Sequence, residues 1–191
     1  MSKQSTYSQI VNAADNLFYR NGFEHTSFTD ISNVVSISRG NFYHHFKTKD
    51  DILNAVIKER MANTQAMLEE WEKTEETPEG RITCYIKILL TNWNKIQHYG
   101  CPVGTLCTEL AKLNHASKKE ATQIFTLFRL WLAQQFEQLG HRENADQLAM
   151  HVLAWSQGVA TLSSTFQNKE FAEQEVQRIT TWLENLNHQH L

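Results

Sequence analysis

Apolar residues recur along most of the chain at the spacing of an α-helix. Ile10, Val11, Ala14 and Phe18 are one example, and their separations of three and four residues place them on one helical face. No segment shows the strict alternation of apolar and polar residues that is typical of a half-buried strand. The pattern predicts an all-α protein of about nine helices, with approximate ranges 6–21, 27–35, 38–46, 48–73, 78–99, 103–113, 117–139, 144–160 and 170–186.

Residues 26–49 read as two short helices separated by a tight joint. Ser27 and Asp30 have the spacing of a capping box that begins the first helix, and Ser38 is placed to cap the second. Phe42 and Phe46 would anchor one edge of the second helix to the first. The other edge carries polar and aromatic side chains, namely Arg39, Asn41, Tyr43, His44 and His45. Such an edge is suited to the major groove of DNA.

From Gly22 to Leu53 the chain resembles the DNA-binding domain of TetR-type transcriptional regulators. The resemblance rests on matching positions that include Gly22, Phe23, Thr26, Ser27, Asp30, Ile31, Ser38, Gly40, Tyr43, His45, Phe46, Lys47, Lys49 and Leu53. It implies a helix-turn-helix that contacts DNA through Thr26, Ser27, Ser38, Arg39, Gly40, Asn41, Tyr43, His44, His45 and Lys49. The chain departs from the family at Ser36, where members usually carry glycine, and a left-handed non-glycine residue costs about 1 kcal/mol. The alternative is a pair of ordinary core helices.

Charge and helix length divide the chain into two predicted domains, residues 1–48 and 49–191. The net charge is −3, but residues 1–49 hold five Lys and Arg against three Asp and Glu. The remaining residues hold thirteen against eighteen, which is the distribution expected of a DNA-binding domain attached to an acidic body. A helix from Thr48 to about Lys73 would link the two domains over roughly 35–40 Å.

The last two predicted helices are apolar on more than one face. Ser156, Gly158 and Ala160 would allow another helix to approach closely. The resemblance implies that these helices form a four-helix bundle with a second copy of the chain, so that a homodimer binds a palindromic DNA operator. The alternative is a pair of buried core helices in a monomer.

The second predicted domain is rich in aromatic residues, which either form its core or line a ligand site. The resemblance implies that a small, mostly apolar effector binds there, and we expect its site to include Tyr85, Trp93, Tyr99, Cys101, Cys107, Phe125, Phe128 and Trp155. The segment from Gly100 to Leu110 also resembles one found in a subset of TetR-type regulators, some of which respond to electrophiles or oxidants. Cys101 would lie near a helix start, where a thiolate is stabilised. For each cysteine, a buried packing role remains the alternative.

Several classes of protein are not favoured by the sequence. Three cysteines do not suggest a disulfide framework, and neither a signal peptide nor an apolar run of about eighteen residues is present. No metal-binding, cofactor-binding or hydrolase motif occurs. We therefore expect a cytoplasmic, non-enzymatic protein without metal or cofactor, and the resemblance implies that it is a ligand-responsive repressor. A thiol enzyme using Cys101 and a helical protein-binding adaptor are the two alternatives.

Overall fold

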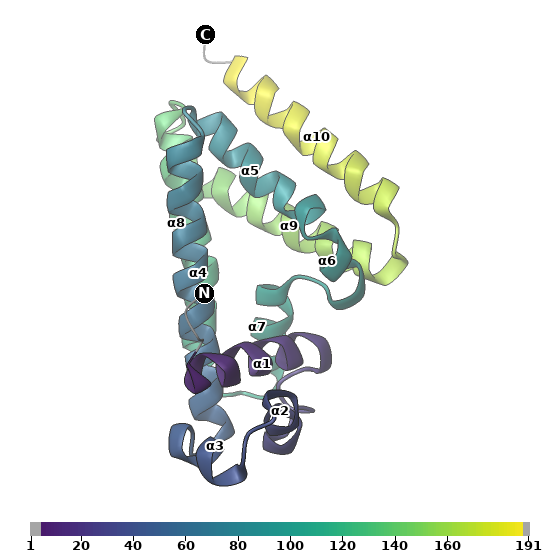
Figure 1. The fold of residues 1–191 in the computed structure, drawn as a ribbon. Helices are drawn as coiled ribbons and strands as arrows, with labels where there is room; N and C mark the ends of the chain where they lie inside the picture. Colours follow the sequence, from purple (N-terminus) through teal and green to yellow (C-terminus); the bar gives the residue numbers. More distant parts are fainter. Residues whose placement is uncertain (1–4, 189–191) are drawn as a thin grey trace. The chain divides into compact units, whose positions relative to one another are not determined.

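The computed structural model describes residues 5–188, apart from the side chains of Arg39, Asn187 and His188. Helices form all the regular structure in this range, which confirms the predicted all-α class (Figure 1). The ten helices are α1 (Thr6–Asn21), α2 (Phe28–Val35), α3 (Arg39–His45), α4 (Lys49–Thr74), α5 (Pro78–Thr91), α6 (Trp93–Tyr99), α7 (Pro102–Lys112), α8 (Lys118–Gln138), α9 (Ala145–Phe166) and α10 (Lys169–His188). None of these helices combines the length and apolar character needed to cross a lipid bilayer.

The helix expected over residues 78–99 is divided at Asn92 into α5 and α6. Asn92 has φ −101° and ψ 15°, outside the helical region. Its side-chain amide donates to the carbonyl of Ile88 at 3.1 Å, and its backbone N–H donates to the same oxygen at 3.0 Å. An asparagine that bonds to the preceding turn competes with regular helix geometry. The apolar period runs through this break, so periodicity alone did not reveal it.

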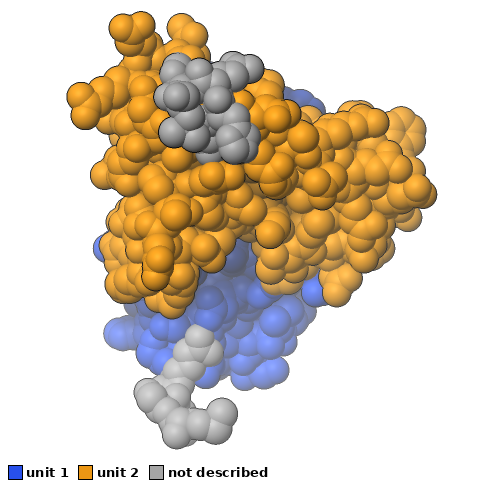
Figure 2. Space-filling view, turned by 90° about the horizontal axis from the view of Figure 1, so that it is seen from above, with its two compact units in different colours: residues 1–63, 105–124 blue, residues 64–104, 125–191 orange. Residues whose placement is uncertain are grey.

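The helices form two compact units, shown in blue and orange in Figure 2. The first unit comprises residues 1–63 and 105–124, and the second comprises residues 64–104 and 125–191. The first unit therefore includes residues 105–124, which the sequence-based division had assigned to the second domain. This segment holds most of α7 and the start of α8.

The first unit has its own apolar core. Ile10 and Ala14 of α1, Ile31 of α2 and Phe42 of α3 are at most 1% exposed. α4 and α7 complete the same cluster with Ile52, Leu53, Val56, Leu106 and Leu110. Phe42 and Phe46 both lie in it, which confirms that they anchor α3. Each fully buried aliphatic or aromatic side chain contributes roughly 1.5–3 kcal/mol to stability.

The second unit is built from α5, α6, α9 and α10, together with the parts of α4 and α8 that belong to it. α10 packs along both α5 and α9, and α6 packs against α9. Leu89, Trp93 and Ile96 form a buried cluster with Val159 of α9 and Ala172 of α10. We call this the α6–α9 cluster. Its partly buried members include Cys101 and Trp155.

Candidate DNA-binding surface and effector region

Local hydrogen bonds define the start of α2. The Ser27 hydroxyl accepts from the Asp30 backbone N–H at 3.2 Å, and the Asp30 carboxylate accepts from the Ser27 backbone N–H at 2.8 Å. The predicted capping box is thus confirmed. Bonds from the hydroxyl and the backbone of Ser27 hold the pKa of Asp30 below its ordinary value. Asp51 has a similar arrangement with Thr48 before α4, which lowers the pKa of Asp51.

The joint between α2 and α3 is formed by Ser36 in a left-handed conformation. Its φ is 57° and its ψ is 41°, and its N–H donates to the carbonyl of Ser32 at 3.0 Å. This geometry is the one for which glycine is usually selected. Ser38 then caps α3, because its hydroxyl accepts from the Asn41 N–H at 3.3 Å. The turn therefore forms despite the substitution of serine for glycine.

α3 presents one buried and one exposed face. Asn41 and His44 are exposed, as is Gly40, where an added Cβ would meet no atom within 4 Å. Tyr43 is 49% exposed and stacks on Phe28 with ring centroids 5.6 Å apart. This stack orients the Tyr43 ring on α3. The backbone of Arg39 opens α3, but its side chain lies outside the description.

His45 is half-buried, and its ring approaches those of His44 and Tyr7 at centroid distances of 5.3 and 6.4 Å. Ser27 and Ser38 are exposed and lie at the starts of α2 and α3, respectively. Seven of the residues predicted to contact DNA thus lie on α3 or at a helix start and are at least partly exposed. They are those at positions 27, 38, 40, 41, 43, 44 and 45. Together they form a surface rich in hydrogen-bonding groups.

Thr26 and Lys49, also predicted to contact DNA, have hydrogen-bond partners within the first unit. Thr26 is 1% exposed and its hydroxyl donates to the carbonyl of Gly22 at 2.7 Å. The Lys49 ammonium donates to the carbonyls of Phe23 and Glu24 at 3.0 and 3.3 Å and lies 4.2 Å from the centroid of the Phe23 ring. Both residues stabilise the turn between α1 and α2.

Glu109 of α7 binds the other side of this turn and was not predicted to do so. Its carboxylate accepts from the backbone N–H groups of Phe23 and Glu24, both at 2.9 Å. Gly22 has φ 87°, and a Cβ there would lie 2.9 Å from Glu109 Oε1, so a side chain at position 22 would displace the carboxylate. The only sequence signal was the Glu-Leu pair in the segment from Gly100 to Leu110.

Polar side chains of α9 form hydrogen bonds with α5 and with Cys101 within the second unit. The Tyr85 hydroxyl of α5 lies 3.0 Å from the Ser156 hydroxyl, and burial raises the pKa of Tyr85. The Tyr85 ring meets Phe128 edge-on at 5.2 Å. Gln157 donates from its amide to Cys101 Sγ at 3.5 Å. The expected effector residues Tyr85, Cys101 and Phe128 are therefore in contact with core elements.

Cys101 occupies the position of a helix cap. It directly precedes Pro102, the first residue of α7, and its sulfur accepts from the Gly104 N–H at 3.4 Å. A side-chain acceptor three residues before its donor is the arrangement of an N-cap. Cys101 also belongs to the α6–α9 cluster with Trp93 and Trp155. The structure thus gathers these three expected effector residues in one place.

The remaining expected effector residues are not gathered there. Cys107 packs against the core of the first unit. Tyr99 and Phe125 are half-buried residues of the second unit, and neither belongs to the α6–α9 cluster. Cys107 thus belongs to the first unit, whereas the other seven expected effector residues belong to the second.

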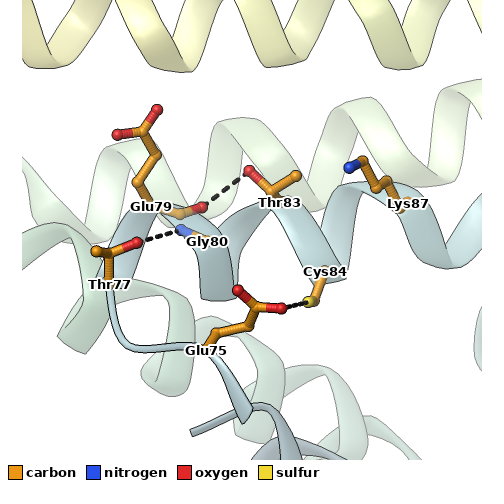
Figure 3. A pocket seen from close by; sticks show the side chains of 7 residues that line it. All are labelled: Glu75, Thr77, Glu79, Gly80, Thr83, Cys84 and Lys87. Carbon is orange, nitrogen blue, oxygen red and sulfur yellow. Dashed lines mark hydrogen bonds between the residues drawn. The ribbon is translucent and has the colours of Figure 1, made fainter.

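An open pocket of about 290 Å³ lies on the second unit at the start of α5 (Figure 3). It contains none of the expected effector residues and is lined by Glu75, Thr77, Glu79, Gly80, Thr83, Cys84 and Lys87. The Cys84 thiol lies 3.8 Å from a Glu75 carboxylate oxygen, and burial followed by the Glu75 charge raises the pKa of Cys84. Within the described residues, no group of three or more His, Cys, Asp or Glu side chains could hold a metal ion.

Comparison with known proteins agrees with this geometry. Residues 10–56 match the family described as bacterial regulatory proteins of the tetR family. Residues 61–174 match the C-terminal domain of LmrA/YxaF-like transcriptional regulators. The chain belongs to the TetR family. It is a DNA-binding transcriptional regulator of that family.

Individual proteins resemble this chain over nearly all of its length. An uncharacterized HTH-type transcriptional regulator of Lactococcus lactis is 26% identical over 96% of this chain and 95% of its own. The structure of a TetR transcriptional regulator from Legionella pneumophila matches with a TM-score of 0.85 and 22% identity over 97% of this chain and 99% of that chain. The reduced form of Escherichia coli NemR matches with a TM-score of 0.77 and 20% identity, covering 92% and 95%. These two structures establish similarity of fold.

Proposed function

We propose that this TetR-family regulator is a cytoplasmic homodimeric repressor. It binds a palindromic operator through α3 and is released by a small, mostly apolar or electrophilic effector. The exposed face of α3 carries the proposal, because Asn41, Tyr43 and His44 leave hydrogen-bonding groups on a helix anchored by Phe42. Such a helix enters the major groove in helix-turn-helix proteins.

The contacts divide by chemistry. Asn41, at the start of α3, and Arg39 beside it are proposed to read base edges, as amide and guanidinium groups do. Ser27, Ser38 and the Tyr43 hydroxyl are proposed to bind phosphates and position the helix. The His45 imidazole is likewise proposed to bind a phosphate. Lys49 donates to two backbone carbonyls, so at most its third N–H remains for a phosphate.

In-vitro selection of duplex sites by the purified protein, followed by mobility-shift titration, tests this assignment. Asn41→Ala is expected to weaken the selected site by about 1–3 kcal/mol while changing random duplex little. Tyr43→Phe keeps the ring stack on Phe28 and should weaken both duplexes alike. Equal losses on both duplexes for Asn41→Ala would remove its base-reading role. A wild-type protein without salt-dependent duplex binding would instead favour the adaptor or the thiol enzyme.

The homodimer is supported by an exposed stripe on α9, which we call the α9 stripe: Met150, Ala154, Gly158, Leu162 and Phe166. Consecutive members are four residues apart and adjacent on the helix surface, so together they form one exposed ridge that winds gradually around the helix. Met150, Leu162 and Phe166 are 45%, 43% and 71% exposed in the single chain. Of the three small residues expected at this surface, Gly158 is exposed, whereas Ser156 and Ala160 are 3% and 0% exposed, so the expectation was wrong for those two because they pack inside the single chain. An apolar face of this kind is typical of a surface that a second copy covers.

The effector region is proposed to lie in the second unit around Tyr85, Trp93, Cys101, Phe128 and Trp155. Mostly apolar walls with a few polar groups are typical of small-molecule sites. Trp93→Phe should alter the dose of effector needed to release DNA while leaving DNA affinity unchanged. An unchanged dose-response would remove Trp93 from the site.

An electrophilic effector would act at Cys101, whose sulfur accepts bonds from Gly104 and Gln157. An adduct at the sulfur would displace Gln157 and disturb the α7 cap. Brief maleimide labelling of the folded protein followed by mass spectrometry measures the reactivity. Cys101 should label faster than Cys84, and Cys101→Ser should lose the response. Slow labelling of Cys101 together with a normal response of Cys101→Ser would refute the electrophile mechanism and leave a reversible ligand.

A further inference from the structure

The helix α9 carries two buried polar atoms whose bonding differs from that of their neighbours. Among the residues that the structure describes, the indole N–H of Trp155 and the hydroxyl of Ser163 are fully shielded from solvent and have no hydrogen-bond partner. Ser163 itself is 1% exposed. Buried polar atoms are nearly always paired in folded proteins, so each exception requires an explanation.

Adjacent residues show that unpaired groups are not general in this region. Ser156 donates to the carbonyl of Leu153 at 2.8 Å and lies 3.0 Å from the Tyr85 hydroxyl. Gln157 donates to both Cys101 and Ser156. Elsewhere in the second unit, Trp131 donates its indole N–H to a Glu72 carboxylate oxygen at 2.8 Å. The lack of a partner for the Trp155 indole N–H is therefore a property of its place in the α6–α9 cluster and not of buried indoles in this unit generally.

The cluster around Trp155 restricts what could bind to this donor. Its other members are apolar or weakly polar, namely Leu89, Leu90, Trp93, Ile96 and Cys101 with Val159, Ala160, Phe171 and Ala172. An ionised acceptor among these apolar side chains would lose its hydration, which is unfavourable, whereas a neutral acceptor requires only one donor.

We infer that the Trp155 indole N–H is the donor that binds a neutral carbonyl oxygen of the effector, as in a ketone, aldehyde or quinone, and that carboxylates are excluded. The inference rests on the proposed effector-regulated function and specifies the chemistry of its ligand. Ser163 lies eight residues further along α9, about 12 Å away. The same oxygen therefore cannot reach both groups, and Ser163 is assigned no contact with it.

Three naphthalene probes of similar size test the inference by titration calorimetry: acetylnaphthalene with a neutral carbonyl, isopropylnaphthalene without an acceptor, and naphthoate with a carboxylate. Wild-type protein should bind the ketone roughly three- to ten-fold more tightly than the hydrocarbon, as one hydrogen bond provides. It should bind naphthoate more weakly than either. Trp155→Phe retains an aromatic ring and should abolish the preference for the ketone. Trp131→Phe, whose indole N–H is already paired, is the matched control and should preserve that preference.

A spectroscopic measurement keeps the test independent of how well the variants fold. The chain has five tryptophans, so indole-labelled protein gives five N–H resonances. Acetylnaphthalene should shift the Trp155 resonance and isopropylnaphthalene should not. Assignment comes from Trp155→Phe or, by elimination, from variants at the other four positions. Equal affinity for ketone and hydrocarbon, no binding of any probe, or an unmoved Trp155 resonance would each overturn the inference. None of these results would bear on DNA binding, which the mobility shift measures separately.

Discussion

Replacing Gly158 with leucine affects the single chain and the proposed dimer in opposite directions. In the single chain, a Cβ at position 158 meets no atom within 4 Å, because the residue lies on the exposed α9 stripe. Leucine also favours a helix interior over glycine by about 0.5–1 kcal/mol. The folded chain should therefore tolerate the change or be slightly stabilised by it.

In the proposed dimer, the same side chain would lie between two helices that approach closely at glycine. Inserting bulk into a packed interface costs about 1–3 kcal/mol per site. A two-fold interface contains the residue twice, so the total is roughly 2–6 kcal/mol. The dimer dissociation constant should rise by roughly 30-fold to more than 10,000-fold.

Sedimentation velocity at micromolar concentration measures this shift, and circular dichroism checks that helicity is retained. Gly158→Leu should sediment as a folded monomer, with affinity for a palindromic site falling steeply. The control is Gln123→Leu, which adds the same side chain at an exposed position of α8 and should leave the dimer unchanged. A folded Gly158→Leu dimer of wild-type affinity would show that the α9 stripe is not the interface.

Three further changes test the first unit. Glu109→Gln can keep at most one of the two bonds to the backbone N–H groups of Phe23 and Glu24, and it should lower the free energy of unfolding by about 1–3 kcal/mol in urea titrations. The exposed Glu59→Gln should change it by less than about 0.5 kcal/mol, and equal effects would show that these two bonds do not stabilise the fold. Ser36→Gly should raise that free energy by roughly 0.5–1 kcal/mol because it relieves the left-handed serine, and a destabilised variant would contradict the strain argument. The lowered pKa of Asp30 means that its cap contributes stability above its ordinary pKa of 3.8 and loses it as pH falls through the folded value. Asp30→Asn should therefore melt below wild type at pH 6, with the gap narrowing as pH falls below 3.8. A gap that is constant with pH would rule out the charged cap.

Features that depend on local sequence were predictable. The box formed by Ser27 and Asp30 needs only residues within one turn, and the burial of Phe42 and Phe46 follows from their spacing in α3. Even the left-handed joint could be placed at Ser36, because the family pattern marks that position for glycine. Periodicity and capping act over three or four residues, so one sequence contains enough information to identify them.

Features that neither periodicity nor a capping pattern marks were not predictable from one sequence, whether their partners are near or distant. The periodic face of residues 78–99 continues through Asn92, where a side-chain bond to the preceding turn breaks the helix. Thr26 and Lys49 match a DNA-binding pattern by residue type, yet their donors bind carbonyls of the α1–α2 turn. The Lys49 bond to Phe23 spans 26 positions, and sequence spacing gives no indication of such a contact.

The segment from Gly100 to Leu110 shows how one short stretch can serve two structural purposes. At its start, Cys101 caps α7 and accepts from Gln157, which are contacts within the second unit. Near its end, Glu109 holds the α1–α2 turn and Leu110 is fully buried in the core of the first unit. The residues that lie between these contacts belong to one helix of eleven residues, Pro102–Lys112. Packing and capping therefore explain Cys101, Glu109 and Leu110 of this segment without a ligand. Any response of Cys101 to an effector would have to break or alter the hydrogen bonds that its sulfur accepts from Gly104 and Gln157.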